Sequence, residues 1–148
     1  MHGFLRYWLP VLAWMLVIFV ASTDLMSAQH TSRFIGPFLL WLNPEISPET
    51  IAAVQFSIRK AAHVTEYAIL AALLLRALHG GIRGVRFSHV IVALGVASTY
   101  AALDEYHQSL IASRTGSPID VVIDASGALL GVVICWWIIA GGNRRRAI

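Results

Sequence analysis

Charged side chains are scarce in this sequence, and cysteine is almost absent. Asp, Glu, Lys and Arg make up 13% of the 148 residues, whereas hydrophobic residues make up 57%. A water-soluble domain carries about 25% charged residues, so this composition indicates a small integral membrane protein. The single cysteine, Cys135, excludes a disulfide within the chain and leaves the redox compartment open.

Four segments are long and apolar enough to span a bilayer, which takes about 20 residues of helix. They cover residues 4–22, 56–78, 89–108 and 119–140. The first has Arg6 ahead of its apolar core, as a signal peptide does, but DLMSAQH after it offers no small-x-small cleavage site. We therefore predict an all-α fold in which one domain, residues 1–148, forms a bundle of four transmembrane helices.

The chain between the first and second spans has two further features. The run RFIGPFLLWL, residues 33–42, is too short to span, so we predict that it lies at the membrane surface. Ser47, Pro48 and Glu49 favour the start of a helix, as N-cap, first helical residue and acidic residue of the first turn. Whether this helix runs straight into the second span or bends is left open.

The basic residues predict an orientation, because loops on the cytoplasmic side are rich in Lys and Arg. All eight Asp and Glu residues lie on the side opposite to seven arginines, so we expect both termini in the cytoplasm. This topology accounts for the basic tail, and we predict no nucleic-acid partner. The arginines are Arg6, Arg76, Arg83, Arg86, Arg144, Arg145 and Arg146.

Ionisable residues of three spans fall at one depth. If Arg76 marks the inner boundary, a helical rise of about 1.5 Å per residue places His63 roughly 6 Å and Glu66 roughly 11 Å below the outer boundary. The same count brings Asp104 near the outer end of the third span and Asp124 about 6 Å into the fourth. The three counts predict one polar layer at outer-leaflet depth.

Helical periodicity predicts which faces carry these groups. Lys60, His63 and Tyr67 share one stripe, while Asp104 shares another with His107 and Gln108. On the fourth span, Gly127 and Gly131 continue the face of Asp120 and Asp124 as a G-x-x-x-G, which favours close helix packing. We expect this acidic face to point into the bundle, with Arg114 above it on a short loop.

The formal charges of this layer do not balance. Three cations (Arg59, Lys60 and Arg114) face five carboxyl groups (Glu66, Asp104, Glu105, Asp120 and Asp124), which gives −2 when both histidines are neutral. A site of low dielectric holds such an imbalance only at a high cost in free energy. Protonation, a bound cation or solvation must offset it, so the pattern indicates dependence on pH or on a ligand.

Two stretches, RKAAHVTEYAILAALL and ALDEYHQSLIASRTGSPIDVVIDASGALLG, together with the order of four spans, resemble the VanZ-like family of bacterial membrane proteins. The resemblance covers the second to fourth spans well and the first weakly. Members of this family are multi-pass proteins of the bacterial plasma membrane, and the resemblance implies the same for this chain. The family's namesake is associated with low-level resistance to the glycopeptide teicoplanin, so the resemblance also implies a role in the cell envelope. It leaves the chemistry open.

Our principal hypothesis is a site for an anionic lipid or lipid-linked envelope precursor, with phosphate held by arginine forks and a lysine charge. His63 or His107 would transfer protons, with Glu66 or Asp104 orienting the ring. The predicted catalytic residues are His63, Glu66, Asp104, His107, Asp120 and Asp124. The predicted ligand-binding residues are Arg59, Lys60, Tyr67, Glu105, Gln108 and Arg114.

Other readings of the polar layer stay open. It is also consistent with a structural network in a protein that works through a partner, or with proton-coupled transport. A third alternative is a metal-dependent membrane enzyme, in which His63-x-x-Glu66 and Asp104-x-x-His107 present metal ligands together with Asp120 and Asp124. The run SRTGSPIDVVID bears some similarity to the last motif of PAP2-type lipid phosphatases, but Asp120 stands where their histidine would be. We therefore do not infer phosphatase activity from this run, assign no metal or cofactor, and leave open whether any reaction is catalysed.

Overall fold

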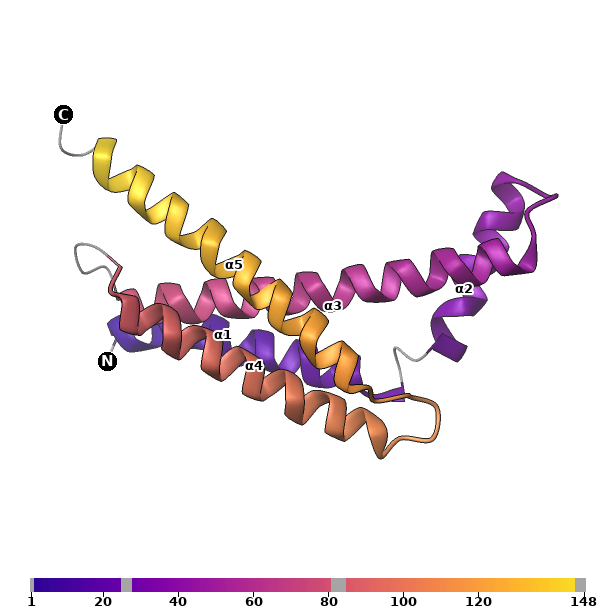
Figure 1. The fold of residues 1–148 in the computed structure, drawn as a ribbon, viewed down its shortest axis with the longest axis horizontal. Coiled ribbons are helices and arrows are strands. Elements are labelled where there is room, and N and C mark those ends of the chain that lie inside the picture. The colour runs from indigo at the N-terminus through magenta and orange to yellow at the C-terminus, as the bar shows by residue number, and fades with distance from the viewer. Residues whose placement is uncertain (1, 25–27, 81–84, 146–148) are drawn as a thin grey trace.

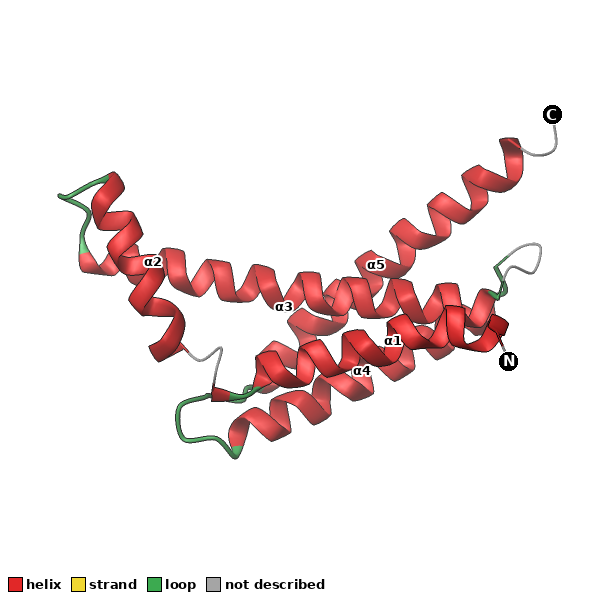
Figure 2. Ribbon diagram, turned by 180° about the vertical axis from the view of Figure 1, so that it is seen from behind, coloured by secondary structure: helices red, strands yellow, loops and turns green. Residues whose placement is uncertain are grey.

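The structure of this protein is a computed structural model, which describes residues 2–24, 28–80 and 85–145. All regular structure in these ranges is helical (Figures 1 and 2). The helices are α1 (His2–Ser22), α2 (Ala28–Leu42), α3 (Pro48–His79), α4 (Phe87–Ser109) and α5 (Pro118–Arg145). Two arginines used to predict the orientation, Arg83 and Arg146, lie outside the described ranges.

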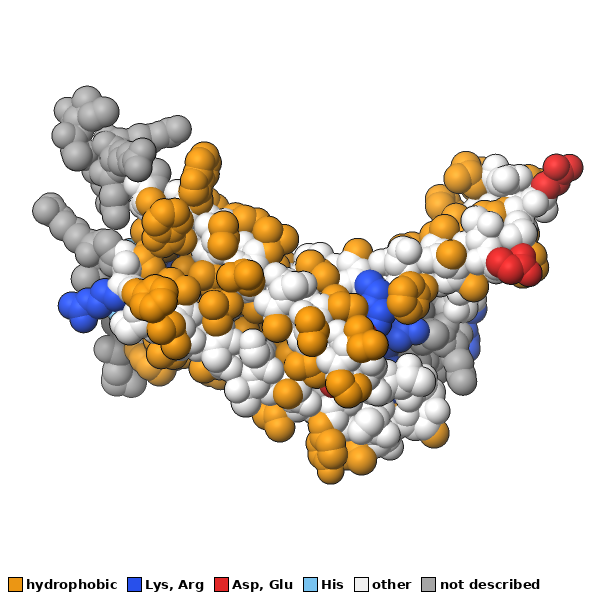
Figure 3. Space-filling view, in the orientation of Figure 1, with side chains coloured by type: hydrophobic (Ala, Val, Ile, Leu, Met, Phe, Trp, Pro, Cys, Tyr) orange, Lys and Arg blue, Asp and Glu red, His pale blue; other side chains and the backbone are white. Residues whose placement is uncertain are grey.

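Four of these helices are long and apolar enough to cross a membrane, which confirms the predicted four-span bundle. They are α1, α3, α4 and α5. Large apolar side chains such as Leu12, Leu103 and Trp137 are 59–75% exposed, and side chains of this kind cover the flank of the bundle in Figure 3. Because a bilayer offers no water to the backbone, helices with apolar outer faces are the form that such segments take there.

The helix α3 is continuous over 32 residues, which settles the question left open by the sequence. Its first turn is capped as predicted, since the Ser47 side chain accepts a hydrogen bond from the Thr50 backbone N–H at 3.2 Å. It ends at Gly80, whose φ of 55° suits the left-handed conformation of a helix C-cap. The second span, predicted at residues 56–78, is thus the C-terminal part of a longer helix.

The closest packing in the bundle joins α3 to α5. A methyl group built on Gly127 would overlap the backbone of Val64, and one on Gly131 would overlap the carbonyl oxygen of Ala68. The two glycines therefore let the backbones of α3 and α5 touch, as the G-x-x-x-G pattern predicts. This contact fixes the register of the polar residues one or two turns away.

The first helix is tied to the bundle by bonds from side chains to backbone. The Trp14 indole N–H donates to the Glu66 carbonyl at 2.9 Å, joining α1 to α3. The Tyr100 hydroxyl donates to the Met15 carbonyl at 2.8 Å, joining α4 to α1. Each bond satisfies a polar donor that lipid could not, and together they hold the middle of α1 against α3 and α4.

The short helix α2 lies against the start of α3, where Ser32 donates to Gln55 at 3.2 Å. Together with the loop between α4 and α5, it occupies one end of the molecule, which we call the α2 end (Figure 1). The start of α1 and the end of α5 lie at the opposite end. The predicted surface segment, residues 33–42, is thus part of a longer helix.

Candidate functional site

The predicted polar residues gather at the α2 end, on three helices and one loop. Arg59, Lys60, His63 and Glu66 lie on α3, and Arg114 lies on the loop between α4 and α5. The remaining members are Tyr67 of α3, Asp104, Glu105, His107 and Gln108 of α4, and Asp120 and Asp124 of α5. The structure divides this set into a cavity, a buried group of three residues, an ion pair and two outlying residues.

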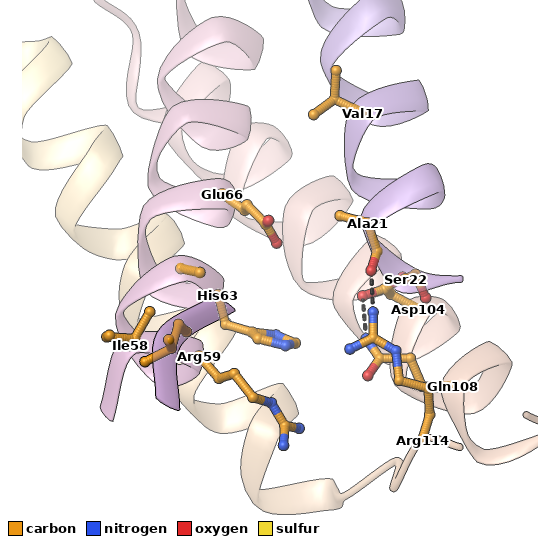
Figure 4. Close-up of a pocket in the computed structure, with 12 residues that line it drawn as sticks. Val17, Ala21, Ser22, Ile58, Arg59, His63, Glu66, Asp104, Gln108 and Arg114 are labelled. Atoms are coloured by element: carbon orange, nitrogen blue, oxygen red, sulfur yellow. Dashed lines mark hydrogen bonds between the residues drawn. The ribbon is translucent and has the colours of Figure 1, made fainter. Parts of the chain in front are cut away.

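A cavity of about 300 Å³ opens among these elements (Figure 4). Its polar wall includes Arg59, His63, Glu66, Asp104, Gln108 and Arg114, so half of the predicted site residues line one space. In Figure 4 the guanidinium groups of Arg59 and Arg114 and the His63 ring point into the gap between α3 on one side and α1 with α4 on the other.

The cavity does not coincide with the three spans that the sequence indicated. Val17, Ala21 and Ser22 of α1 and Ile35 of α2 also line it. Of the three spans on which the sequence places the polar layer, α3 and α4 line the cavity, whereas the lining includes no residue of α5 and α1 closes one wall. The sequence did not indicate this role of α1, because the helix lines the cavity with two apolar residues and Ser22 as its one polar residue.

Arg114 reaches across the cavity to the end of α1. Its Nε donates to the Thr23 carbonyl at 3.2 Å, and its Nη2 donates to the Ala21 carbonyl. The last carbonyls of a helix lack partners within the helix and carry partial negative charge, so a guanidinium is a favourable partner there. Arg114 thus fastens the loop between α4 and α5 to α1.

The two cavity arginines lie close enough to repel one another. Burial lowers the pKa of Arg114, and the neighbouring Arg59 guanidinium lowers it further. An arginine nevertheless stays protonated in proteins, so both positive charges remain in the cavity. Neither side chain forms an ion pair with a carboxylate among the described residues, and the buried Arg59 Nε has no hydrogen-bond partner there.

Behind the cavity wall, His63 meets two carboxylates. Its Nδ1 lies 3.1 Å from Asp124 Oδ1 and 3.7 Å from Glu105 Oε1. Asp124 is fully buried and Glu105 is 4% exposed. The carboxylates that hold His63 are therefore Asp124 and Glu105, whereas the predicted orienting residues, Glu66 and Asp104, line the cavity.

Lys60 is engaged elsewhere. Its ammonium forms an ion pair with Asp120 and lies 5.0 Å from the centre of the Phe56 ring. Because Asp120 neutralises it and it does not line the cavity, Lys60 is a poor candidate for a ligand contact. The same ion pair occupies Asp120, whose predicted catalytic role stays a prediction.

Two predicted residues, His107 and Tyr67, do not line the cavity. The His107 Nδ1 lies 3.2 Å from the Ser22 hydroxyl, and its ring stacks on Phe19 with centroids 5.2 Å apart. Tyr67 is fully buried in the apolar core. Within the cavity wall, Gln108 donates to Asp104 at 3.0 Å, so the expected α4 face is split, with Asp104 and Gln108 toward the cavity and His107 toward α1.

Some contacts of the site come from the backbone and carry no residue signature. The Ser117 N–H donates to Glu105 Oε2 at 2.9 Å, which fixes that carboxylate from the start of α5. Gly116 permits this approach, because a methyl group there would overlap the Glu105 carbonyl. Of the polar groups described here, His63, Glu105 and Asp124 are close enough together to share a metal ion.

Four apolar helices around a layer of ionisable residues define a polytopic helical membrane protein with a polar site inside its bundle. Residues 7–139 match the model of the VanZ/LLP1 family, and the chain belongs to that family. This match confirms the resemblance seen in the two sequence stretches. No curated protein and no solved structure matched the chain.

Proposed function

We propose that this protein is a multi-pass protein of the bacterial plasma membrane that binds an anionic lipid or lipid-linked envelope precursor. Both termini would lie in the cytoplasm, so that the α2 end faces the outer leaflet. The phosphate of the ligand would occupy the cavity at headgroup depth. The observation that carries the proposal is the presence in one cavity of two arginines, Arg59 and Arg114, that form no ion pair with a carboxylate in the described part of the chain.

Electrostatics favours an anion at this position. Two like charges held in one partly desolvated cavity raise its free energy, and a phosphate between them would relieve that repulsion. Guanidinium groups bind phosphate through paired N–H donors. Arg114 keeps two of its nitrogens on carbonyls at the end of α1, so Arg59, whose Nε has no hydrogen-bond partner among the described residues, offers the freer fork.

The lining suits an amphipathic ligand. A volume of about 300 Å³ lies at the lower end of the range for small-molecule pockets. Val17, Ile35, Ile58 and Ala62 supply an apolar wall beside the arginines, as a headgroup joined to a hydrocarbon chain requires. On the polar wall, Glu66 and Asp104 would accept hydrogen bonds, which favours a headgroup that also carries hydroxyl or amine donors.

His63 is the cavity residue best placed to exchange a proton with such a ligand. It lines the cavity on one side and contacts Asp124 on the other, which is the arrangement of a positioned acid–base group. In this proposal binding is the function, and His63 is the residue through which a reaction would proceed.

The test uses a soluble lipid pair with the purified full-length protein in a mild detergent. Dioctanoyl phosphatidic acid supplies the anionic headgroup, and dioctanoyl phosphatidylcholine is the neutral control. Calorimetry should detect binding of the first, and Arg59→Gln should weaken it by about 10-fold or more, because a hydrogen-bonded charge contact contributes about 1.5–3 kcal/mol. Arg33→Gln, which removes an exposed arginine of α2, should leave binding within about twofold.

Two results would overturn the proposal. Equal affinity for both lipids would show that the headgroup charge is not recognised. Unchanged affinity in a folded Arg59→Gln variant would show that the cavity is not where the lipid binds. If the polar layer is a structural network instead, Arg59→Gln should lower the thermal stability while the wild type shows no preference for the anionic lipid.

A further inference from the structure

Two buried carboxylate oxygens at the α2 end have no hydrogen-bond partner among the described residues. They are Oε1 of Glu105 and Oδ2 of Asp124. The side chains are 4% and 0% exposed, so water does not reach them freely. A buried, unsatisfied carboxylate oxygen is unfavourable in free energy, and a bound ion or water is one partner that can satisfy it.

The two carboxylates and His63 form a compact group supplied by three different helices. One ligand atom from each lies within 4.8 Å of the others. A metal with tetrahedral bonds of about 2.0–2.2 Å holds its ligand atoms about 3.4 Å apart, so side-chain movements of up to about an ångström would complete the site. The Ser117 N–H holds the second oxygen of Glu105, which leaves Oε1 directed at the group.

The surrounding charges do not neutralise these carboxylates. Lys60, one turn from His63 on α3, already pairs with Asp120. Arg114 is fixed to α1 carbonyls, and Arg59 has no carboxylate within ion-pair distance among the described residues. A single protonated His63 would leave one negative charge over, whereas a divalent cation would balance both carboxylates.

We propose that His63, Glu105 and Asp124 bind a divalent transition-metal cation, Mn²⁺ or Zn²⁺, at the wall of the cavity. One imidazole and two carboxylates are ligands that both ions accept, and three protein ligands leave coordination positions for water or a ligand atom. This set differs from the one predicted from spacing, because Glu66 and Asp104 line the cavity and His107 contacts Ser22. The proposal does not depend on lipid binding.

The test is Mn²⁺ binding to the untagged full-length protein, stripped with a chelator and held in detergent without phospholipid. Loss of the free Mn²⁺ signal in electron paramagnetic resonance should show one ion bound per chain, displaceable by Zn²⁺. Asp124→Asn and Glu105→Gln keep the shape of each side chain and should weaken binding by about 10-fold or more. Glu45→Gln, which removes an exposed carboxylate between α2 and α3, is the matched control and should bind as the wild type does.

A second measurement needs no variant, so it decides the matter even if the substitutions prevent folding. Electron spin echo envelope modulation of bound Mn²⁺ should show coupling to a ¹⁴N nucleus, because His63 is the nitrogen ligand of the proposed site. Absence of that coupling would overturn the proposal. So would a wild type that binds no Mn²⁺ or Zn²⁺, or folded Asp124→Asn and Glu105→Gln variants with wild-type affinity.

Discussion

His63 Nδ1 of α3 and Asp124 Oδ1 of α5 lie 3.1 Å apart, although 61 positions separate the two residues in the chain. They meet because the next turns of the same helices are in backbone contact, where Gly127 lies against Val64 and Gly131 against Ala68. A wider spacing between α3 and α5 would separate the imidazole from the carboxylate. The glycines therefore determine the geometry of the site as well as the packing.

Gly131→Ala should destabilise the protein, because the added methyl group overlaps the Ala68 carbonyl and forces α3 and α5 apart. Overpacking of this kind costs about 1–3 kcal/mol. Gly95→Ala is the matched control, since a methyl group there has nothing within 4 Å and removes a flexible glycine from the interior of α4. Thermal unfolding in detergent should show a lower midpoint for Gly131→Ala and an equal or higher one for Gly95→Ala. Equal midpoints for the two variants would contradict the close packing.

Arg114→Gln should loosen the end of α1, because the two carbonyls of Ala21 and Thr23 lose their donors. Each hydrogen bond from a charged group contributes about 1.5–3 kcal/mol to the free energy of unfolding. Hydrogen exchange at the last turn of α1 should become faster, while exchange in the middle of α5 stays unchanged. Arg33→Gln controls for the loss of a positive charge at the same end of the molecule, and faster exchange there too would point to a general electrostatic effect.

The proposed orientation can be tested through the single cysteine. In a Cys135→Ser background, Glu45→Cys places a thiol on the exposed loop between α2 and α3, and Ser88→Cys places one on the exposed start of α4. A membrane-impermeant maleimide added to intact cells should label Glu45→Cys at once and Ser88→Cys after permeabilisation. The reverse pattern would place the α2 end in the cytoplasm and remove the outer-leaflet site. Neither substitution alters an arginine, so the charges that set the orientation are preserved.

The two proposed sites should strengthen one another, because His63 belongs to both. A divalent cation on His63, Glu105 and Asp124 adds positive charge to the cavity wall, so Mn²⁺ should tighten phosphatidic acid binding by about fivefold or more. By linkage, the lipid should tighten Mn²⁺ binding by the same factor. The Asp124→Asn variant lacks a proposed metal ligand, so any effect of Mn²⁺ on its lipid affinity measures direct binding of Mn²⁺ to the lipid. The same lipid affinity with and without Mn²⁺ in the wild type would show that the sites are independent.

The span boundaries and the polar layer could be predicted because they depend on length, hydropathy and helical rise. The Ser47 cap and the Gly127 and Gly131 contact were also predictable, since each follows from the local stereochemistry of one or two residue types. Periodicity gave the face on which Asp124 lies. These properties belong to single helices, and the properties of a single helix can be predicted from its own residues.

The pairing of residues between helices could not be predicted in the same way. Periodicity assigns His63 a face, but the choice among Glu66, Asp104, Glu105 and Asp124 as its partner depends on how the helices cross. The role of α1 was missed for a different reason, because Ala21 and Thr23 act through backbone carbonyls. Every residue has a carbonyl, so no residue type marks that use. The Ser117 N–H is hidden in the same way.

The length of α3 has a consequence for how the protein meets its bilayer. Its 32 residues make a rod about 48 Å long, whereas the hydrocarbon core is about 30 Å thick. The helix must therefore tilt in the bilayer or extend beyond it. Because α2 lies beside the start of α3, the tilt of α3 sets the position of α2 relative to the lipid (Figure 2). Membranes of different thickness would set a different tilt. A change of tilt in this unbroken helix would shift α2 and, with it, Ile35, the α2 residue in the cavity wall.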